Sequence, residues 1–161
     1  PGVFMKMDFD SLLNNIDITL LPRLGSGSGR DVYDLRNGYV VKHAKNNKGM
    51  AQNQTEYVIY SLDSSGIFAP APALSEDGLY LIMVRAEKIM DFNQVRQYYN
   101  ARSDRQLFKK PPFKDLPRKY GLLLPDLYRP VNWGIIDNRP VIIDYGFTRR
   151  VRNMYYFPFK L

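Results

Sequence analysis

Five consecutive small residues near the start of the chain have the composition of a phosphate-binding turn. They are Gly25, Ser26, Gly27, Ser28 and Gly29. Because glycine has no side chain, the backbone N–H groups of such a turn can approach phosphate oxygens closely. A dinucleotide-binding turn would lead directly into a helix and a P-loop into Gly-Lys-Ser/Thr, and this segment does neither. The same composition also fits a flexible turn between two strands.

Two charged residues follow at intervals that place one on a strand and the other on a helix. Lys42 ends the apolar segment Val40-Val41-Lys42, ten residues after Val32. Glu56 comes fourteen residues later, in a stretch free of proline. Each also has an ordinary interpretation, since Lys42 could be a solvated charge at a strand edge and Glu56 a surface glutamate.

Three polar residues surround the last predicted strand pair of the second half. Asp144 opens the triplet Asp144-Tyr145-Gly146 directly after an apolar segment, and Asn132 lies twelve residues before it. Asp126 lies a further six residues upstream. Taken singly, Asp126 could be a turn residue, Asn132 a cap and Asp144 a surface charge at a strand end.

The elements that must position these residues can be predicted from hydrophobic periodicity and turn signals. Helices are expected at residues 8–17, 47–63 and 91–101, the second with Met50, Tyr57, Val58 and Leu62 on its apolar face. Strand pairs are expected at 31–36 with 39–44, 70–75 with 79–84, and 133–136 with 141–143, and residues 18–24 are expected to be extended. The first pair is joined by Asn37-Gly38, a dipeptide suited to a two-residue hairpin turn.

Taken together, the glycine hairpin, the strand lysine, the helix glutamate and the three later polar residues resemble the protein-kinase-like superfamily. The resemblance covers about residues 18–148 and is to a minimal member of bacterial or phage type. It implies a two-lobed α+β fold with a small antiparallel-sheet N-lobe and a truncated, mostly helical C-lobe. The expected divisions are an N-terminal extension at 1–17, the N-lobe at 18–86 and the C-lobe at 87–161.

The resemblance also implies a role for each polar residue in binding ATP and Mg²⁺ between the lobes. The loop from Gly25 to Gly29 would cover the phosphates, and Lys42 would hold the α- and β-phosphates with Glu56 fixing its position. Asp144 and Asn132 would be the Mg²⁺ ligands, and Asp126 would accept the proton of the attacking hydroxyl. The backbone from Val84 to Ala86 would bind adenine, with Met83 against the ring.

The sequence departs from the kinase-like pattern at four points. Arg30 stands where the loop would have its third glycine, and Leu124-Pro125 replaces the usual His-Arg before Asp126. The interval from Asp126 to Asn132 is one residue longer than usual, so a bulge is expected there. Only residues 147–161 follow Gly146, which leaves no room for an activation segment or a peptide-binding platform.

Two functions are therefore expected from the sequence. The first is an ATP-dependent phosphotransferase whose acceptor is small or surface-bound and is not identified. The alternative is a catalytically inactive, kinase-like binding or regulatory protein.

Composition excludes several other kinds of chemistry. The 161-residue chain has no cysteine, which excludes disulfides, thiolate metal sites and cysteine nucleophiles, and His43 is its one histidine. No apolar run is long enough to cross a bilayer, and the N-terminus lacks the pattern of a secretory signal. We expect a cytoplasmic protein without membrane contact, and its oligomeric state is not predicted.

The net charge of +7 is concentrated in the second half of the chain. Residues 1–90 hold nine Lys/Arg and ten Asp/Glu, whereas residues 91–161 hold fourteen and six. Basic residues gather at Arg96, Arg102, Arg105, Lys109, Lys110, Lys114, Arg118 and Lys119, and again at 149–152 before an aromatic tail. This pattern fits an acidic protein partner or a nucleic acid, and equally a solvated surface; the aromatic tail is expected to pack back onto the lobe.

Overall fold

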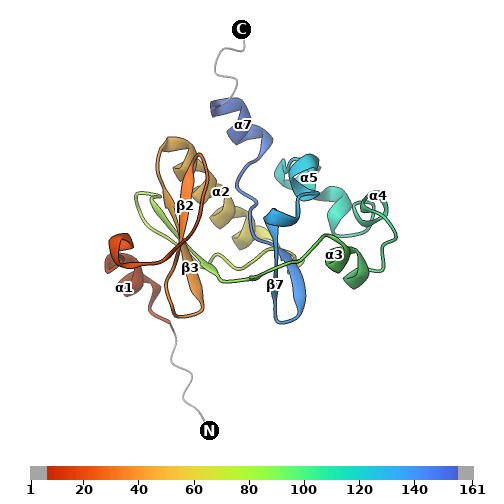
Figure 1. Ribbon diagram of the computed structural model, residues 1–161. Coiled ribbons are helices and arrows are strands. Elements are labelled where there is room, and N and C mark those ends of the chain that lie inside the picture. The colour runs from red at the N-terminus through yellow and green to blue at the C-terminus, as the bar shows by residue number, and fades with distance from the viewer. Residues whose placement is uncertain (1–6, 156–161) are drawn as a thin grey trace.

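The computed structural model describes residues 7–155 and contains two antiparallel sheets with helices around them (Figure 1). The larger sheet has the strand order β1-β2-β3-β5-β4. Its strands are β1 (Arg23–Ser26), β2 (Arg30–Asp34), β3 (Tyr39–Ala44), β4 (Ala73–Leu74) and β5 (Tyr80–Val84). The smaller sheet has the order β6-β7-β8 and consists of β6 (Glu87–Lys88), β7 (Trp133–Ile136) and β8 (Arg139–Ile142).

The helices divide unequally between the two sheets. The larger sheet is accompanied by α1 (Phe9–Asn14), the 3-10 turn η1 (Ile18–Leu20) and α2 (Asn47–Leu62). The smaller sheet is accompanied by α3 (Asn93–Tyr98), α4 (Asp104–Leu107), η2 (Phe113–Asp115), α5 (Leu116–Tyr120), α6 (Leu124–Leu127) and η3 (Pro130–Asn132). The last helix, α7 (Arg149–Tyr155), packs against α2. The expected α+β class, with an antiparallel sheet followed by a mostly helical half, is confirmed.

One segment between α2 and β4 joins the two sheets. The Ile142 amide of β8 donates to the carbonyl of Ile67 at 2.7 Å, and the Ala69 amide donates back to the Ile142 carbonyl at 2.9 Å. A single cluster of buried apolar side chains extends from Leu81 and Met83 in the larger sheet to Trp133 in the smaller one. These contacts fix the end of β8, and with it Asp144, beside the first half of the chain.

The long helix α2 buries a different face from the one that the sequence predicts. The sequence indicated an apolar face of Met50, Tyr57, Val58 and Leu62, but Val58 is 50% exposed and Leu62 69% exposed. The buried residues are Gly49, Asn53, Glu56 and Ile59. Their spacing of three to four residues places them on one side of the helix. The inner face of α2 is therefore mostly polar, which a search for apolar periodicity cannot detect.

Two local predictions need smaller corrections. Residues 18–24 are not extended throughout, because the Asp17 carboxylate accepts from the Thr19 amide at 3.0 Å and starts the turn η1. The hairpin between β2 and β3 has positive φ at Arg36 and Gly38 rather than at Asn37 and Gly38. Neither change moves a predicted site residue off its element.

Candidate functional site

Lys42 and Glu56 form a buried ion pair between β3 and α2. The Lys42 ammonium donates to Glu56 Oε1 at 2.8 Å and to Oε2 at 3.0 Å. It also donates to the Ile143 carbonyl at 2.6 Å, just after β8. Lys42 is therefore held simultaneously by α2 and by the strand that leads into Asp144. Burial lowers the pKa of Lys42 from its ordinary value.

Glu56 is fully buried and accepts from several donors around it. Besides Lys42, the guanidinium of Arg30 donates to its carboxylate, and the Tyr145 amide donates to Oε2 at 3.1 Å. Burial acts to raise the pKa of Glu56, but the charges of Arg30 and Lys42 outweigh it and hold the pKa below its ordinary value. Glu56 is therefore an ionised carboxylate between two cations.

Arg30 is a further member of this buried cluster, and the sequence does not reveal its position. It opens β2 and is only 8% exposed. Its guanidinium donates to Asn53 Oδ1 at 3.1 Å and to Asp144 Oδ1 at 3.1 Å, in addition to Glu56. Asn53 in turn donates to the carbonyl of Gly78 at 3.0 Å. One sequence signal could have indicated a buried polar cluster here: Asn53 lies three residues before Glu56, so both lie on the same side of the helix.

Asp144 lies at the open side of this cluster. Its side chain is 48% exposed, whereas those of Arg30 and Glu56 are buried. The following turn is fixed by Gly146, where an added Cβ would lie 2.6 Å from the Gln52 carbonyl oxygen of α2. The triplet Asp144-Tyr145-Gly146 therefore packs tightly on α2 and presents only its aspartate to solvent.

Asp126 and Asn132 are joined to each other, and Asn132 is joined to Ile143, the residue before Asp144. The Asn132 side-chain amide donates to the Asp126 carbonyl at 2.8 Å, and the Ile143 amide donates to the Asn132 carbonyl at 2.8 Å. Burial raises the pKa of Asp126 above its ordinary value, and the negative charge of Asp144 acts in the same direction. Between Asp126 and Asn132 the chain forms two successive turns, the end of α6 and the turn η3.

The glycine-rich loop has one face fixed by protein and another open to solvent. The Gly29 carbonyl accepts from the Lys45 amide at 2.8 Å, and an added Cβ on Gly29 would lie 3.2 Å from the Gly49 backbone of α2. An added Cβ on Gly25 would meet nothing within 4 Å, and one on Gly27 only the Arg30 carbonyl oxygen at 3.7 Å. Gly29 is therefore closely packed against α2, while Gly25 and Gly27 leave space in which a ligand could approach. The exposed hydroxyls of Ser26 and Ser28 accept from Lys45 and Lys48.

The segment expected to bind adenine begins at Val84, the last residue of β5. Met83 is buried, and the Val84 amide donates to the Pro70 carbonyl at 2.8 Å. The Arg85 amide donates to the Gly38 carbonyl at 3.0 Å. Both amides are engaged within the chain, so Ala86 is the remaining expected hinge position whose N–H could serve a ligand. Ala86 packs against Gly134, because a Cβ added to Gly134 would lie 2.6 Å from the Ala86 Cβ.

A metal ion at this site would have few protein ligands. Among residues 7–155, no group of three or more His, Asp and Glu side chains is placed to hold a metal. Asp144 and Asn132 offer a carboxylate and an amide oxygen, which are donors that Mg²⁺ accepts. Because Mg²⁺ is commonly bound by one or two carboxylates together with substrate phosphates and water, this donor set fits a nucleotide-bound ion.

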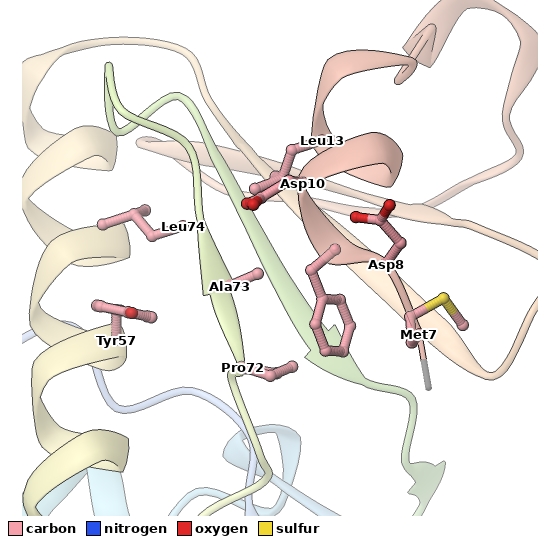
Figure 2. A pocket seen from close by; sticks show the side chains of 9 residues that line it. Met7, Asp8, Asp10, Leu13, Tyr57, Pro72, Ala73 and Leu74 are labelled. Carbon is pink, nitrogen blue, oxygen red and sulfur yellow. The ribbon is translucent and has the colours of Figure 1, made fainter. Parts of the chain in front are cut away.

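A separate surface hollow of about 480 Å³ lies away from these residues. It is lined by side chains from α1, α2 and β4 and from the residues just before α1 and β4 (Figure 2), namely Met7, Asp8, Phe9, Asp10, Leu13, Tyr57, Pro72, Ala73 and Leu74. None of the residues that the sequence singled out as a site residue lines this hollow.

The basic residues of the second half include both ion-paired and exposed side chains. Arg96 pairs with Asp104, and Arg118 pairs with Asp115 at 3.3 Å, while Lys109 and Lys114 are exposed. In the aromatic tail, Tyr155 is half-buried, and residues 156–161 lie outside the described part of the chain. In residues 7–155, no helix is both long and apolar enough to span a membrane.

The order of elements is the one that the protein-kinase-like resemblance predicts: glycine hairpin, strand lysine, helix glutamate and, after the smaller sheet begins, Asn132 and Asp144. No protein-family model matches the chain, and no curated protein matches it. Among solved structures, it is similar to APH(2")-IIa in a ternary complex with streptomycin and ATP, with 15% identity and a TM-score of 0.46. It is also similar to the gentamicin complex of APH(2")-IIa, with 15% identity and a TM-score of 0.45. Each alignment covers 89% of this chain and 71% of the other.

Proposed function

We propose that this protein is an ATP-dependent phosphotransferase that moves the γ-phosphoryl group of ATP to a hydroxyl acceptor. The observation that carries the proposal is the buried Lys42–Glu56 ion pair, which is held against Ile143, the residue between β8 and Asp144. Phosphoryl transfer depends mainly on positioning and on neutralising spread-out negative charge. A lysine fixed by a buried glutamate, beside an exposed aspartate and under an open glycine loop, is suited to that task.

The roles of the residues follow from their positions. Lys42 binds α- and β-phosphate oxygens, and Glu56 keeps its ammonium in one place. The backbone of Gly25 and Gly27 lies against the phosphates, where the loop is free of side chains. Asp144 and Asn132 would hold Mg²⁺, which would supply neutralisation of phosphate charge.

Asp126 is the proposed base of the reaction. As the acceptor oxygen forms its bond to the γ-phosphorus, the bond to the β–γ bridging oxygen breaks and ADP leaves. The hydroxyl proton passes to the Asp126 carboxylate. Its raised pKa favours this role, because a base works best when its pKa lies nearer the working pH.

Replacement of Asp126 by asparagine should separate binding from transfer. We expect the rate of transfer to fall by about 10²–10⁴-fold, because the general base is lost. The affinity for ATP should change by less than about twofold, because the Asn132 amide bonds to the Asp126 backbone rather than to its side chain. The measurement follows label from the γ-position of ATP into water, small polyhydroxylated compounds, peptides and the protein itself.

The matched control is Asp10→Asn, since Asp10 is an exposed carboxylate of α1 that lines the separate hollow. This variant should keep the parent's rate. If Asp126→Asn transfers label as fast as the parent, Asp126 is not the base. If the parent binds ATP but transfers label to none of these acceptors, the phosphotransferase proposal fails.

That last outcome would favour the second candidate function, a nucleotide-binding module without turnover. The observation in its favour is Arg30, whose guanidinium already engages Asp144. Such a module would use the exposed basic residues of its second half, including Lys109 and Lys114, to engage an acidic protein or a nucleic acid. Binding to a nucleic acid would weaken steeply as salt concentration rises.

A further inference from the structure

Arg30 places a positive charge where a kinase-like glycine loop would have no side chain. It is the residue directly after Gly29, yet its guanidinium lies inside the site, 8% exposed. From β2 it reaches Glu56 on α2 and Asp144 after β8. Three separate elements of the fold therefore meet at one guanidinium group.

The charges of this cluster balance. Arg30 and Lys42 supply two positive charges, and Glu56 and Asp144 supply two negative ones. Lys42 bonds to Glu56 and to a backbone carbonyl, so Arg30 is the cation that contacts Asp144. Its two Nη atoms already donate to Asn53, Glu56 and Asp144, so its charge serves the carboxylates more than an incoming phosphate.

We infer that Arg30 is a resident cation that neutralises Asp144, so that this protein binds nucleotide without requiring a divalent metal ion. The inference rests on the proposed function, because it concerns the same nucleotide site. A bare carboxylate at Asp144 would repel the phosphates unless a metal ion lay between them. A repulsion of this kind across several ångströms of partly buried space is equivalent to about a ten- to hundredfold loss of affinity.

Because one side of Asp144 is exposed, a divalent ion would be needed at the transfer step rather than at nucleotide binding. Arg30 engages Oδ1 from the buried side, while nearly half of the Asp144 side chain faces solvent. The exposed side of the Asp144 carboxylate would therefore stay open to a metal ion after nucleotide has bound, and the ion would be needed for transfer rather than for binding. Binding and transfer would then depend differently on the metal concentration.

The experiment titrates the full chain with ATP by calorimetry, once with excess EDTA and once with excess Mg²⁺. We expect the dissociation constants of the parent in the two conditions to agree within about threefold. For Arg30→Met, affinity in EDTA should fall by about tenfold or more, and Mg²⁺ should restore most of it. Arg23→Met, which removes an exposed arginine of β1, is the matched control and should behave as the parent.

Each outcome separates this inference from the proposed function. A parent that binds ATP only with Mg²⁺ overturns the role of Arg30 and leaves the phosphotransferase proposal standing. Equal binding by Arg30→Met in the two conditions also overturns it. A parent that binds ATP in neither condition overturns the proposed function itself. The comparison on the parent needs no variant, so it remains decisive even if Arg30→Met does not fold.

Discussion

Replacement of Glu56 by glutamine is expected to lower the free energy of unfolding by about 3–5 kcal/mol. Glu56 is fully buried and accepts from Lys42, Arg30 and the Tyr145 amide. Glutamine has nearly the same shape but no charge, so it would leave the buried Lys42 ammonium without its counter-charge. The cost of an uncompensated buried charge is much larger than that of a lost surface pair. Urea unfolding of the parent and the variant measures the difference.

The matched control is Glu76→Gln, in the exposed turn between β4 and β5, which should change stability by less than about 0.5 kcal/mol.

The stability difference between parent and Glu56→Gln should also depend on pH. Because the pKa of Glu56 is lowered in the folded protein, its stabilising effect is complete above the unfolded value of about 4.3. The difference should narrow as the pH falls from there through the lower, folded pKa. If Glu56→Gln lowers the free energy of unfolding by less than about 1 kcal/mol at neutral pH, the buried charge network is contradicted.

Replacement of Lys42 by methionine should remove activity with little loss of stability. Lys42 is the cation proposed to contact the α- and β-phosphates, and loss of one such electrostatic contact typically lowers kcat by about 10²–10³-fold. Glu56 would keep Arg30 as its partner, so stability should fall by less than about 2 kcal/mol, well below the effect of Glu56→Gln. The measurements are the rate of label transfer from ATP and urea unfolding of the same samples.

Lys114→Met removes an exposed lysine of the same type in η2 and should leave both quantities unchanged. A Lys42→Met variant that transfers label at the parent's rate would contradict the assignment of Lys42. A variant as unstable as Glu56→Gln would instead mean that Arg30 alone cannot balance Glu56.

Residue spacing was sufficient to place Lys42 and Glu56 on the elements where they lie. The glycine-rich turn and the apolar segment Val40-Val41-Lys42 are local patterns typical of a strand pair. They were therefore enough to predict β2 and β3. The proline-free stretch after Asn46 gave the helix that carries Glu56. Turn chemistry was less accurate, because one polar side chain, Asp17, starts η1 inside a segment that reads as extended.

The buried face of α2 and the position of Arg30 could not be predicted, for a common physical reason. Hydrophobic periodicity identifies a buried face only when that face is apolar. Here the buried positions include Asn53 and Glu56, which are stable inside because Arg30 and Lys42 satisfy them. That compensation comes from strands distant in sequence, so no local pattern contains it. Sites of this kind are where local rules are expected to fail.

The central claim is that nucleotide binds between the glycine-rich loop and Asp144, and amide chemical shifts of the isotope-labelled protein test it most directly. On titration with ATP and Mg²⁺, we expect saturable shifts concentrated at Gly25, Gly27, Lys42 and Asp144. The amide shifts of residues that line the hollow beside α1 should not change, and they serve as an internal control. Shifts confined to that hollow, or no shifts in a folded sample, would contradict a nucleotide site at this cluster.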